Sequence, residues 1–380
     1  MQGTSLNSKE RIHAALEGRP VDRMPATVLY NQLYHLDHFA ELTGKPAWQR
    51  HAWNHAAPDE HVAVLKQMIA QAPFEIIQPQ GASTREMRER TVFFEKEGTV
   101  FRRDLKTDTI TPVSASSAGH ASDYAANEAQ TVFGVRDFNA RFQLAKAERI
   151  LEDGSLDYIH AAVQTLGKDH FICSGGFVSI LWDCIPYVGQ TNMLTMLIDN
   201  PELIEYMGRK LLDQNIEKIR AFGDVGGDAL YIDDAMGYSD VISVAHYERF
   251  SLPYLKAMVQ EIHRQGMKVI LIYFGGVADR LEQIVSTGAD GLSVETTMKN
   301  YVNDIHDISR KIGGRIALFG NIDPVGILQN GSDAQLKAEI HRQAQAAKTA
   351  RGFIMCTGSP ITPTTPLARV RLFIDLSQHI

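Results

Sequence analysis

Three carboxylates stand at the ends of apolar stretches that have the length of β-strands. Asp233 and Asp234 follow the residues ALYI, and Glu295 follows GLSV. In parallel α/β folds, ligands bind where the carboxyl ends of the strands meet. Carboxylates that share a cleft raise one another's pKa, and general acid catalysis needs a carboxyl group of raised pKa. We therefore expect Asp233, Asp234 and Glu295 to be acid/base and orienting groups. Tyr273 is expected to donate a hydrogen bond to a substrate oxygen.

Further residues at strand ends would contact a substrate through amide and hydroxyl groups. Phe274 would make the pocket more apolar and favour a substrate with an aromatic or hydrophobic body. The expected substrate-binding residues are Asn31, Gln78, Ser174, Phe274 and Ser359. The other groups expected on the same rim are Tyr30, Gln32, Gln80, Gly175, Gly176, Asn321, Asp323 and Thr357.

Some of these residues also have a structural interpretation. Asp234 precedes Ala-Met-Gly and would suit an Asx turn, while Asp323 in GNIDP is better placed to brace its own loop than to do chemistry. His35 and His38 flank an acidic residue and have the types of metal ligands. A solvated helix face explains those two histidines more simply, so no metal ligand is assigned.

The elements that would position these groups alternate between strands and helices. Residues 267–295 read as strand, Gly-Gly turn, short helix and strand, and the strands are continuous apolar runs typical of a parallel sheet. Long helical stretches are expected at 190–223 and 244–265. Eight strands separated by helices favour a (β/α)8 TIM barrel, with residues 1–380 as one domain. The expected strands span residues 26–30, 74–78, 170–174, 229–233, 268–274, 290–294, 316–320 and 353–356.

An irregular segment at residues 80–139 interrupts this alternation after the second strand. Residues 90–104 predict an antiparallel β-hairpin with Glu97 and Gly98 at its turn. Residues 112–127 are rich in Ser, Ala and His and show no period. We interpret the whole segment as an insertion that forms a lid or an interface arm, with a plain surface loop as the alternative.

Composition narrows the class of protein. The 380 residues are 44% hydrophobic and 22% charged, as in ordinary globular proteins, and the net charge is -7. A mildly acidic surface argues against nucleic acid or an anionic membrane as the partner. No apolar run is long enough to span a bilayer, and no secretory signal is present, which predicts a cytoplasmic enzyme. The three cysteines are widely spaced and do not form a disulfide framework.

Four motifs, taken together, resemble the uroporphyrinogen decarboxylase superfamily. They are KERIHAALEGRPVDRMP at 9–25, GDALYIDD at 227–234, GADGLSVE at 288–295 and GNIDP at 320–324. The resemblance implies a (β/α)8 barrel and covers nearly the whole chain. Decarboxylases of this superfamily carry an Arg-rich segment that grips substrate carboxylates and a catalytic Asp after the second strand. Residues 26–36 contain no arginine, and Gln78-Pro-Gln stands where that Asp would be.

The chain is more similar to the superfamily's other branch, methyltransferases that move methyl groups between corrinoid proteins and small molecules. Many of these bind zinc through one His and two Cys, which fall here at Ile272, Phe274 and Ser359. The resemblance therefore implies that zinc is not held at the family's usual site, which argues against thiol methylation. Asp233, Asp234 and Glu295 would be the remaining route to a metal.

We accordingly expect a methyltransferase for a small oxygenated substrate, of the methoxylated aromatic kind, with a corrinoid (cobalamin) protein as its methyl partner. No cofactor is expected on the chain itself, and a homo-oligomer stays open. A cofactor-free decarboxylase or lyase for a small carboxylated substrate is the first alternative, and a catalytically silent barrel that binds a small molecule is the second. An open, shallow rim would favour methyl transfer, a deep closed pocket a lyase, and a filled pocket the silent barrel.

Overall fold

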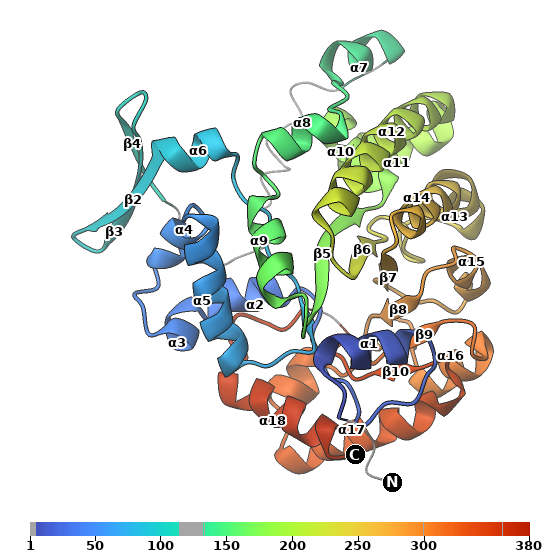
Figure 1. Ribbon diagram of the computed structural model, residues 1–380. Coiled ribbons are helices and arrows are strands. Elements are labelled where there is room, and N and C mark those ends of the chain that lie inside the picture. Colours follow the sequence, from blue (N-terminus) through green and yellow to red (C-terminus); the bar gives the residue numbers. More distant parts are fainter. Residues whose placement is uncertain (1–4, 114–131, 133, 299, 359) are drawn as a thin grey trace.

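A curled parallel sheet of seven strands organises the computed structural model, which describes residues 5–113, 132, 134–298, 300–358 and 360–380 (Figure 1). Its strand order is β1-β5-β6-β7-β8-β9-β10, and all neighbouring strands run parallel. The strands are β1 (Ile76–Ile77), β5 (Phe171–Val178), β6 (Ala229–Asp233), β7 (Lys268–Tyr273), β8 (Gly291–Val294), β9 (Ala317–Phe319) and β10 (Phe353–Ile354).

The segment at residues 25–27 lies between the two edge strands of this sheet. Ala26 forms a parallel bridge with Met355, directly after β10. The backbone N–H of Glu75, directly before β1, donates to the Ala26 carbonyl oxygen at 3.1 Å. The strand expected at 26–30 is thus reduced to one bridge. Its last residue, Tyr30, adopts a left-handed conformation with φ of 59°, and a helix begins at the next residue.

Helices surround the sheet on its outer side (Figure 1). The long helical stretches expected at 190–223 and 244–265 are each two helices, because a proline in the first turn starts the second one. The helices are α1 (Ser8–Leu16), α2 (Asn31–Asp37), α3 (Phe39–Thr43), α4 (Gln49–Trp53), α5 (Pro58–Gln71), α6 (Arg85–Arg90), α7 (Val135–Arg141), α8 (Ala147–Glu152), α9 (Asp157–Leu166), α10 (Ile180–Val188), α11 (Gln190–Asp199), α12 (Pro201–Val225), α13 (Val244–Phe250), α14 (Leu252–Arg264), α15 (Leu281–Val285), α16 (Ile305–Ile312), η2 (Pro324–Gln329), α17 (Asp333–Ala346), η3 (Ala347–Thr349) and α18 (Leu367–Gln378).

The two faces of the sheet pack into separate hydrophobic clusters. The inner cluster includes Phe171, Ile270 and Phe319 and is joined by Ile12 and Leu16 of α1. Helix α1 therefore plugs the inside of the curled sheet. Larger clusters lie between the sheet and the outer helices. Because both faces are buried, the strands are apolar throughout, which is why they could be recognised in the sequence.

A second, antiparallel sheet stands out from the body at the upper left of Figure 1. It consists of β2 (Thr91–Lys96), β3 (Thr99–Asp104) and β4 (Thr109–Pro112) in that order. Strands β2 and β3 pair from Thr91 with Asp104 to Lys96 with Thr99, around the turn residues Glu97 and Gly98. Both turn residues have positive φ, which gives the chain reversal the twist that a two-residue hairpin requires. Most of residues 112–127 lie outside the described part of the chain.

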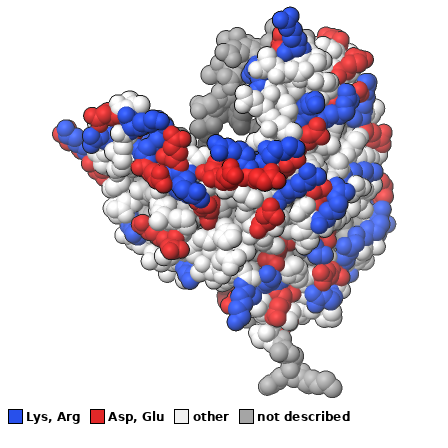
Figure 2. Space-filling view, turned by 45° about the horizontal axis from the view of Figure 1, so that its top comes forward, with Lys and Arg blue, Asp and Glu red and all other residues white. Residues whose placement is uncertain are grey.

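Charged side chains of both signs are interspersed over the face shown in Figure 2. This mixture agrees with the modest net charge of -7 and shows no extended region of one sign. Among the described residues, no helix has both the length and the apolar character required to cross a membrane.

Candidate active site at the carboxyl ends of the strands

The pleat of the strands decides which of the expected residues face the inside of the sheet. In β6 and β7, Ala229, Ile270 and Ile272 belong to the inner cluster, whereas Leu271 and Tyr273 belong to the outer one. Side chains alternate between the faces with a period of two. Asp233 and Phe274, which follow in the inner register, therefore point inward at the carboxyl ends of β6 and β7, while Asp234 and Tyr273 point toward the helices.

Asp233 is paired with a tyrosine from a distant part of the chain. The Tyr30 hydroxyl donates to Asp233 Oδ2 at 2.8 Å, while the side-chain atom Oδ1 is buried and has no hydrogen-bond partner among the described residues. Burial, reinforced by the charge of Asp234 and opposed by the Tyr30 hydrogen bond, raises the pKa of Asp233 to about 7. Burial and the Asp233 charge raise the pKa of Tyr30 as well, so its hydroxyl keeps the proton it donates. Asp233 can therefore hold or release a proton near neutral pH.

Aromatic rings form the walls around this carboxyl group. The rings of Tyr30 and Tyr231 meet edge to face at 5.4 Å, and Tyr30 lies 6.4 Å from Phe274 in a stacked arrangement. Tyr238 contacts Phe274 edge to face at 6.1 Å. All four rings are partly exposed. The neighbouring strand β5 has Gly176 beneath Tyr231, where a Cβ atom would lie 2.0 Å from the Tyr231 ring.

Glu295 lies at the end of β8 and is held by its neighbours. Its Oε2 accepts hydrogen bonds from the Gly275 N–H at 2.9 Å and from the Tyr301 hydroxyl. Its carbonyl oxygen accepts from the side-chain amides of Asn303 at 3.0 Å and Asn321 at 3.2 Å. Glu295 is partly exposed and its carboxylate is held by these bonds, while the acid/base and orienting role expected for it stays a prediction.

Asp234 and Tyr273 lie on the outer side of the aromatic walls, where the Tyr273 ring meets that of Tyr238 edge to face at 6.2 Å. The Tyr273 hydroxyl donates to the Gly237 carbonyl oxygen at 3.0 Å and is completely buried. Asp234 is completely buried too and accepts a hydrogen bond from the Ser251 hydroxyl at 3.0 Å. Burial raises the pKa of Asp234 to about 6. Both residues therefore brace the loop after β6 from its outer side, and the direct roles expected for them stay predictions.

Asn31 and Gln78 bind each other's backbone and so connect α2 to the end of β1. The Gln78 side chain accepts from the Asn31 N–H, and the Asn31 side chain accepts from the Gln78 N–H, both at 3.2 Å. Asn31 also donates to the carbonyl oxygens of Val28 and Ile76. The side-chain oxygen and nitrogen of Asn31 thus both form hydrogen bonds within the protein. The side-chain nitrogen of Gln78 is buried without a described partner and stays available to a ligand.

Ser174 and Ser359 complete the expected set. Strand β5 continues to Val178, four residues beyond its expected end, so Ser174 lies within the strand and not on the rim. Its hydroxyl donates to the Gly226 carbonyl oxygen at 2.7 Å, before β6 begins. The structure thus places Ser174 away from the rim on which it was expected, and its contact with a substrate stays a prediction. Ser359 lies outside the described residues.

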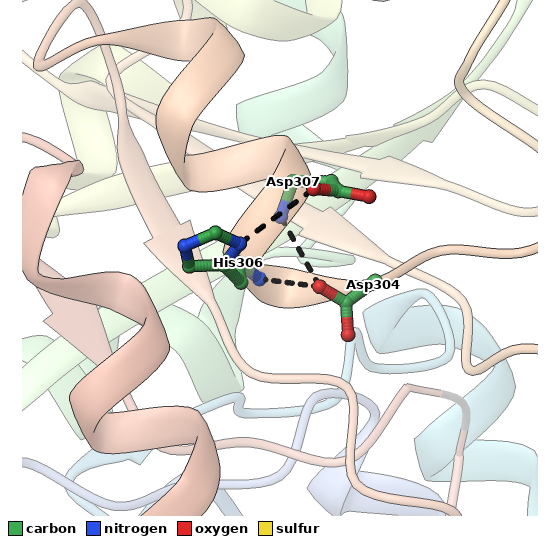
Figure 3. Close-up of side chains that lie close together, drawn as sticks. All are labelled: Asp304, His306 and Asp307. Atoms are coloured by element: carbon green, nitrogen blue, oxygen red, sulfur yellow. Dashed lines mark hydrogen bonds and ion pairs between the residues drawn. The ribbon is translucent and has the colours of Figure 1, made fainter.

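Metal-binding residue types come together at another place, shown in Figure 3. Asp304, His306 and Asp307 lie at the start of α16. Asp304 Oδ1 accepts from the backbone N–H groups of His306 and Asp307 at 3.0 and 3.1 Å, and its Oδ2 accepts from Arg342 at 3.1 Å. This arrangement is that of a helix N-cap whose second oxygen is already paired, so we assign it no metal. At the usual zinc positions of the family, Ile272 and Phe274 offer no ligand atom.

Sequence reasoning placed Tyr30 on the rim without a role and missed Tyr231, Tyr238 and Tyr301. Tyr231 could have been found by counting two residues back from Asp233 along the strand. Tyr238 and Tyr301 lie in loops, where no period indicates which way a side chain points.

A curled parallel sheet with a carboxyl group and aromatic rings at the carboxyl ends of its strands defines an α/β enzyme fold. The sequence matches the family model "Uroporphyrinogen decarboxylase (URO-D)" over residues 125–380, and the chain belongs to this family of enzymes. It is 30% identical over 235 residues to the uroporphyrinogen decarboxylase of Tolumonas auensis, which covers 59% of this chain and 64% of that relative's length. The chain thus spans less than two thirds of this relative.

Two further comparisons extend over almost the whole chain. The chloroplastic uroporphyrinogen decarboxylase 2 of Arabidopsis thaliana is 23% identical over 387 residues, covering 99% of this chain and 87% of the relative. Among solved structures, a methyltransferase from Methanosarcina mazei superposes with a TM-score of 0.70 at 18% identity, covering 98% of this chain and 99% of the other. At that identity the structural likeness establishes the shared fold.

Proposed function

We propose that this chain is a methyltransferase that moves a methyl group between a small oxygenated substrate, of the methoxylated aromatic kind, and a corrinoid carried by a separate protein. The observation that carries the proposal is Asp233, a carboxyl group with a pKa near neutrality inside aromatic walls. The methyltransferase named among the solved structures accords with it.

The chain's own residues would act on the oxygen of the methoxy group. Tyr231, Phe274 and Tyr30 would bind the aromatic ring by stacking and by edge-to-face contacts. As the bond between oxygen and the methyl carbon breaks, its electron pair stays on the oxygen, and Asp233 gives that oxygen its proton. A reduced corrinoid, when the partner presents it, supplies the nucleophile that accepts the methyl group. Tyr30 would hold the resulting carboxylate in place.

Zinc has no part in this proposal. The inward-facing residues at the family's usual positions include Ile272 and Phe274, which carry no donor atom. At the rim, Asp233 Oδ2 and Glu295 Oε2 already accept hydrogen bonds from tyrosines. We therefore derive no step through a metal.

The proposal assumes one domain built on an eight-stranded barrel. Residues 25–27, with their bridge to Met355 and the bond from Glu75 to Ala26, would be the eighth strand that joins the edges of the sheet. The segment at 80–139, which includes the antiparallel sheet, would be an insertion acting as a lid or as an arm that contacts a partner.

Decarboxylation of a small carboxylated substrate is the second candidate, because the curated relatives are named uroporphyrinogen decarboxylases. A substrate with several carboxylates calls for cationic side chains. Helix α2 and its flanks contain no arginine, and the residue at the end of β1 is Gln78, which is not acidic. Arg280 and Tyr273 lie behind the loop and not in the walls. These features rank decarboxylation below methyl transfer.

Product release from two kinds of substrate tests the choice. Purified chain would be incubated with 2-methoxyphenol and reduced cobalamin, and the demethylated catechol measured by chromatography; a parallel reaction with uroporphyrinogen would be assayed for carbon dioxide. We expect corrinoid-dependent catechol release that drops at least 100-fold in Asp233→Asn, the scale of a lost general acid. Asp183→Asn, which alters a partly buried aspartate of α10 bonded to Asn215, is the matched control. Carbon dioxide without catechol would refute the proposal in favour of decarboxylation.

A further inference from the structure

The loop between β6 and α13, residues 234–243, brings a tyrosine to the site that the mechanism above does not use. Tyr238 packs edge to face on Phe274 at 6.1 Å, and its Cβ lies 3.3 Å from where a side chain at Gly275 would begin. The ring is partly exposed, and its hydroxyl finds no hydrogen-bond partner in the described part of the chain. The hydroxyls of Tyr30, Tyr273 and Tyr301 each donate to another protein atom, whereas the Tyr238 hydroxyl can donate to a ligand.

The charges around Tyr238 keep its hydroxyl a donor. Burial is the main cause that raises its pKa, and the carboxylates of Asp233, Asp234 and Glu295 raise it further. Since two of these carboxylates belong to the candidate site, the phenol lies within electrostatic reach of both. A protonated phenol whose ring packs on Phe274, at the same end of the strands as Asp233, can donate to an oxygen lone pair that Asp233 does not occupy.

A buried network fixes the loop from its outer side. Arg280, only 1% exposed, donates to the carbonyl oxygens of Gly237 at 2.8 Å and Ile242 at 2.9 Å. Tyr273 donates to the same Gly237 oxygen at 3.0 Å. These bonds hold the residue immediately before Tyr238. Met236, one residue earlier, has a positive φ of 67°, a conformation that costs energy for a non-glycine residue and turns the chain toward the site.

We propose that Tyr238 is the catalytic hydroxyl that donates a hydrogen bond to the substrate's ether oxygen, and that Tyr273 and Arg280 are positioning residues that aim it through Gly237. The inference rests on the proposed methyl transfer for the identity of that oxygen. An ether oxygen has two lone pairs. Asp233 would donate a hydrogen bond to one of them, and Tyr238 would donate to the other. When the bond to the methyl group breaks, the Tyr238 hydrogen bond strengthens as negative charge develops on the oxygen.

Binding of two ligands of similar shape tests the role of Tyr238 without requiring turnover. Methoxybenzene has the ether oxygen, and ethylbenzene replaces it with a methylene group. Titration calorimetry would give the Kd of each ligand for the wild-type protein, Tyr238→Phe and Tyr206→Phe. Tyr206 bonds Asn139 at the surface and controls for the loss of a tyrosine hydroxyl. We expect wild-type protein and Tyr206→Phe to prefer methoxybenzene, and Tyr238→Phe to show a preference about 3- to 10-fold smaller, as for one lost hydrogen bond, because Asp233 can still donate to the ether oxygen.

A double-mutant cycle tests the positioning role. Tyr273→Phe removes one of the two donors to Gly237 and leaves Arg280 in place, so the fold should survive. We expect Tyr273→Phe to reduce the ether preference about twofold in the presence of Tyr238 and to have no effect on it in Tyr238→Phe. A purely structural Tyr273 would lower stability and leave the preference unchanged.

The outcomes separate this inference from the proposed function. An ether preference that is smaller in Tyr238→Phe than in the wild-type protein, without any methyl transfer, would support the inference and count against the methyltransferase. An ether preference equal in wild-type protein and Tyr238→Phe, or absent from the wild-type protein, would overturn the inference even if methyl transfer were observed.

Discussion

Replacing Asp233 by asparagine should remove activity and at the same time stabilise the protein at alkaline pH. The pKa of Asp233 is raised from 3.8 to about 7, so the folded state holds this proton more tightly than the unfolded chain does. The ionised carboxylate therefore lowers the free energy of unfolding. This loss is absent below pH 4, grows between pH 4 and pH 7, and is complete above pH 7. A shift of about 3 units costs roughly 4 kcal/mol of unfolding free energy when the group is ionised, at about 1.4 kcal/mol per unit.

The pH dependence follows from the same shift. At pH 5 the penalty is only about 1.7 kcal/mol, and at pH 8 it is about 4.3 kcal/mol, by proton linkage between the two pKa values. Asparagine is never charged and keeps an oxygen that can accept the Tyr30 hydrogen bond. The variant should therefore gain about 2.5 kcal/mol of stability relative to the wild-type protein between pH 5 and pH 8.

Urea unfolding of both proteins at pH 5 and pH 8 measures this difference. Asp228→Asn is a control of opposite sign. Burial alone would raise the pKa of Asp228, but hydrogen bonds from His13 and the Ile172 N–H and the nearby Lys9 ammonium lower it overall. Its ionised form therefore stabilises the fold above pH 4, and Asp228→Asn should be destabilising at both pH values. An Asp233→Asn variant whose advantage over wild type is equal at pH 5 and pH 8 would refute the reasoning.

Two further substitutions test the wall of the site and the buried ion pair between Arg11 and Glu75, directly before β1. Gly176→Ala should weaken methoxybenzene binding by about tenfold, the scale of a displaced aromatic contact, because its Cβ would overlap the Tyr231 ring; Gly134→Ala, which meets nothing within 4 Å, is the calorimetric control. Glu75→Gln should lower the unfolding free energy by about 3–5 kcal/mol in urea, because Arg11 is left buried with less charge to pair. A loss below 1 kcal/mol would show that Asp22 compensates fully.

Much of the sheet could be predicted because its strands are apolar along their whole length. Strands buried on both faces are apolar runs, and seven of the eight expected runs overlap strands of the structure. The expected run at 26–30 failed because a run of apolar residues does not reveal a left-handed residue such as Tyr30 at its end. The end of β5 was missed for a related reason. The strand was expected to end at Ser174, with Gly175 and Gly176 on the rim, whereas it passes through both glycines with an irregular register.

The candidate site was harder to predict than the strands because strand ends are shared by two faces. Asp233 and Asp234 are neighbours in the sequence, yet one faces the aromatic walls and the other Ser251 on the helix side. Position at a strand end does not show which of the two aspartates faces the site. The alternation of side chains with a period of two does show it, and the same alternation would have assigned Tyr273 to the outer face together with Leu271.

Strain in the backbone points to the same place as the chemistry. Four non-glycine residues in the described part of the chain have positive φ. Glu97 and Asp108 lie in the turns of the small antiparallel sheet, where such angles are ordinary.

The other two, Tyr30 and Met236, lie in the segments that deliver Tyr30 and Tyr238 to the site. Each costs roughly 1–2 kcal/mol for a residue with a Cβ, and Asp233 adds its own penalty for burial. The Tyr30 phenol bonds Asp233, so one unfavourable backbone angle and one buried carboxyl group meet in a single contact. Folding alone does not explain why these costs are combined, since a less polar pair of residues would make the fold more stable. A requirement for a proton donor at this position would explain it. For this reason we place the proposed chemistry at Asp233 and not at Glu295, whose hydrogen bonds are better satisfied.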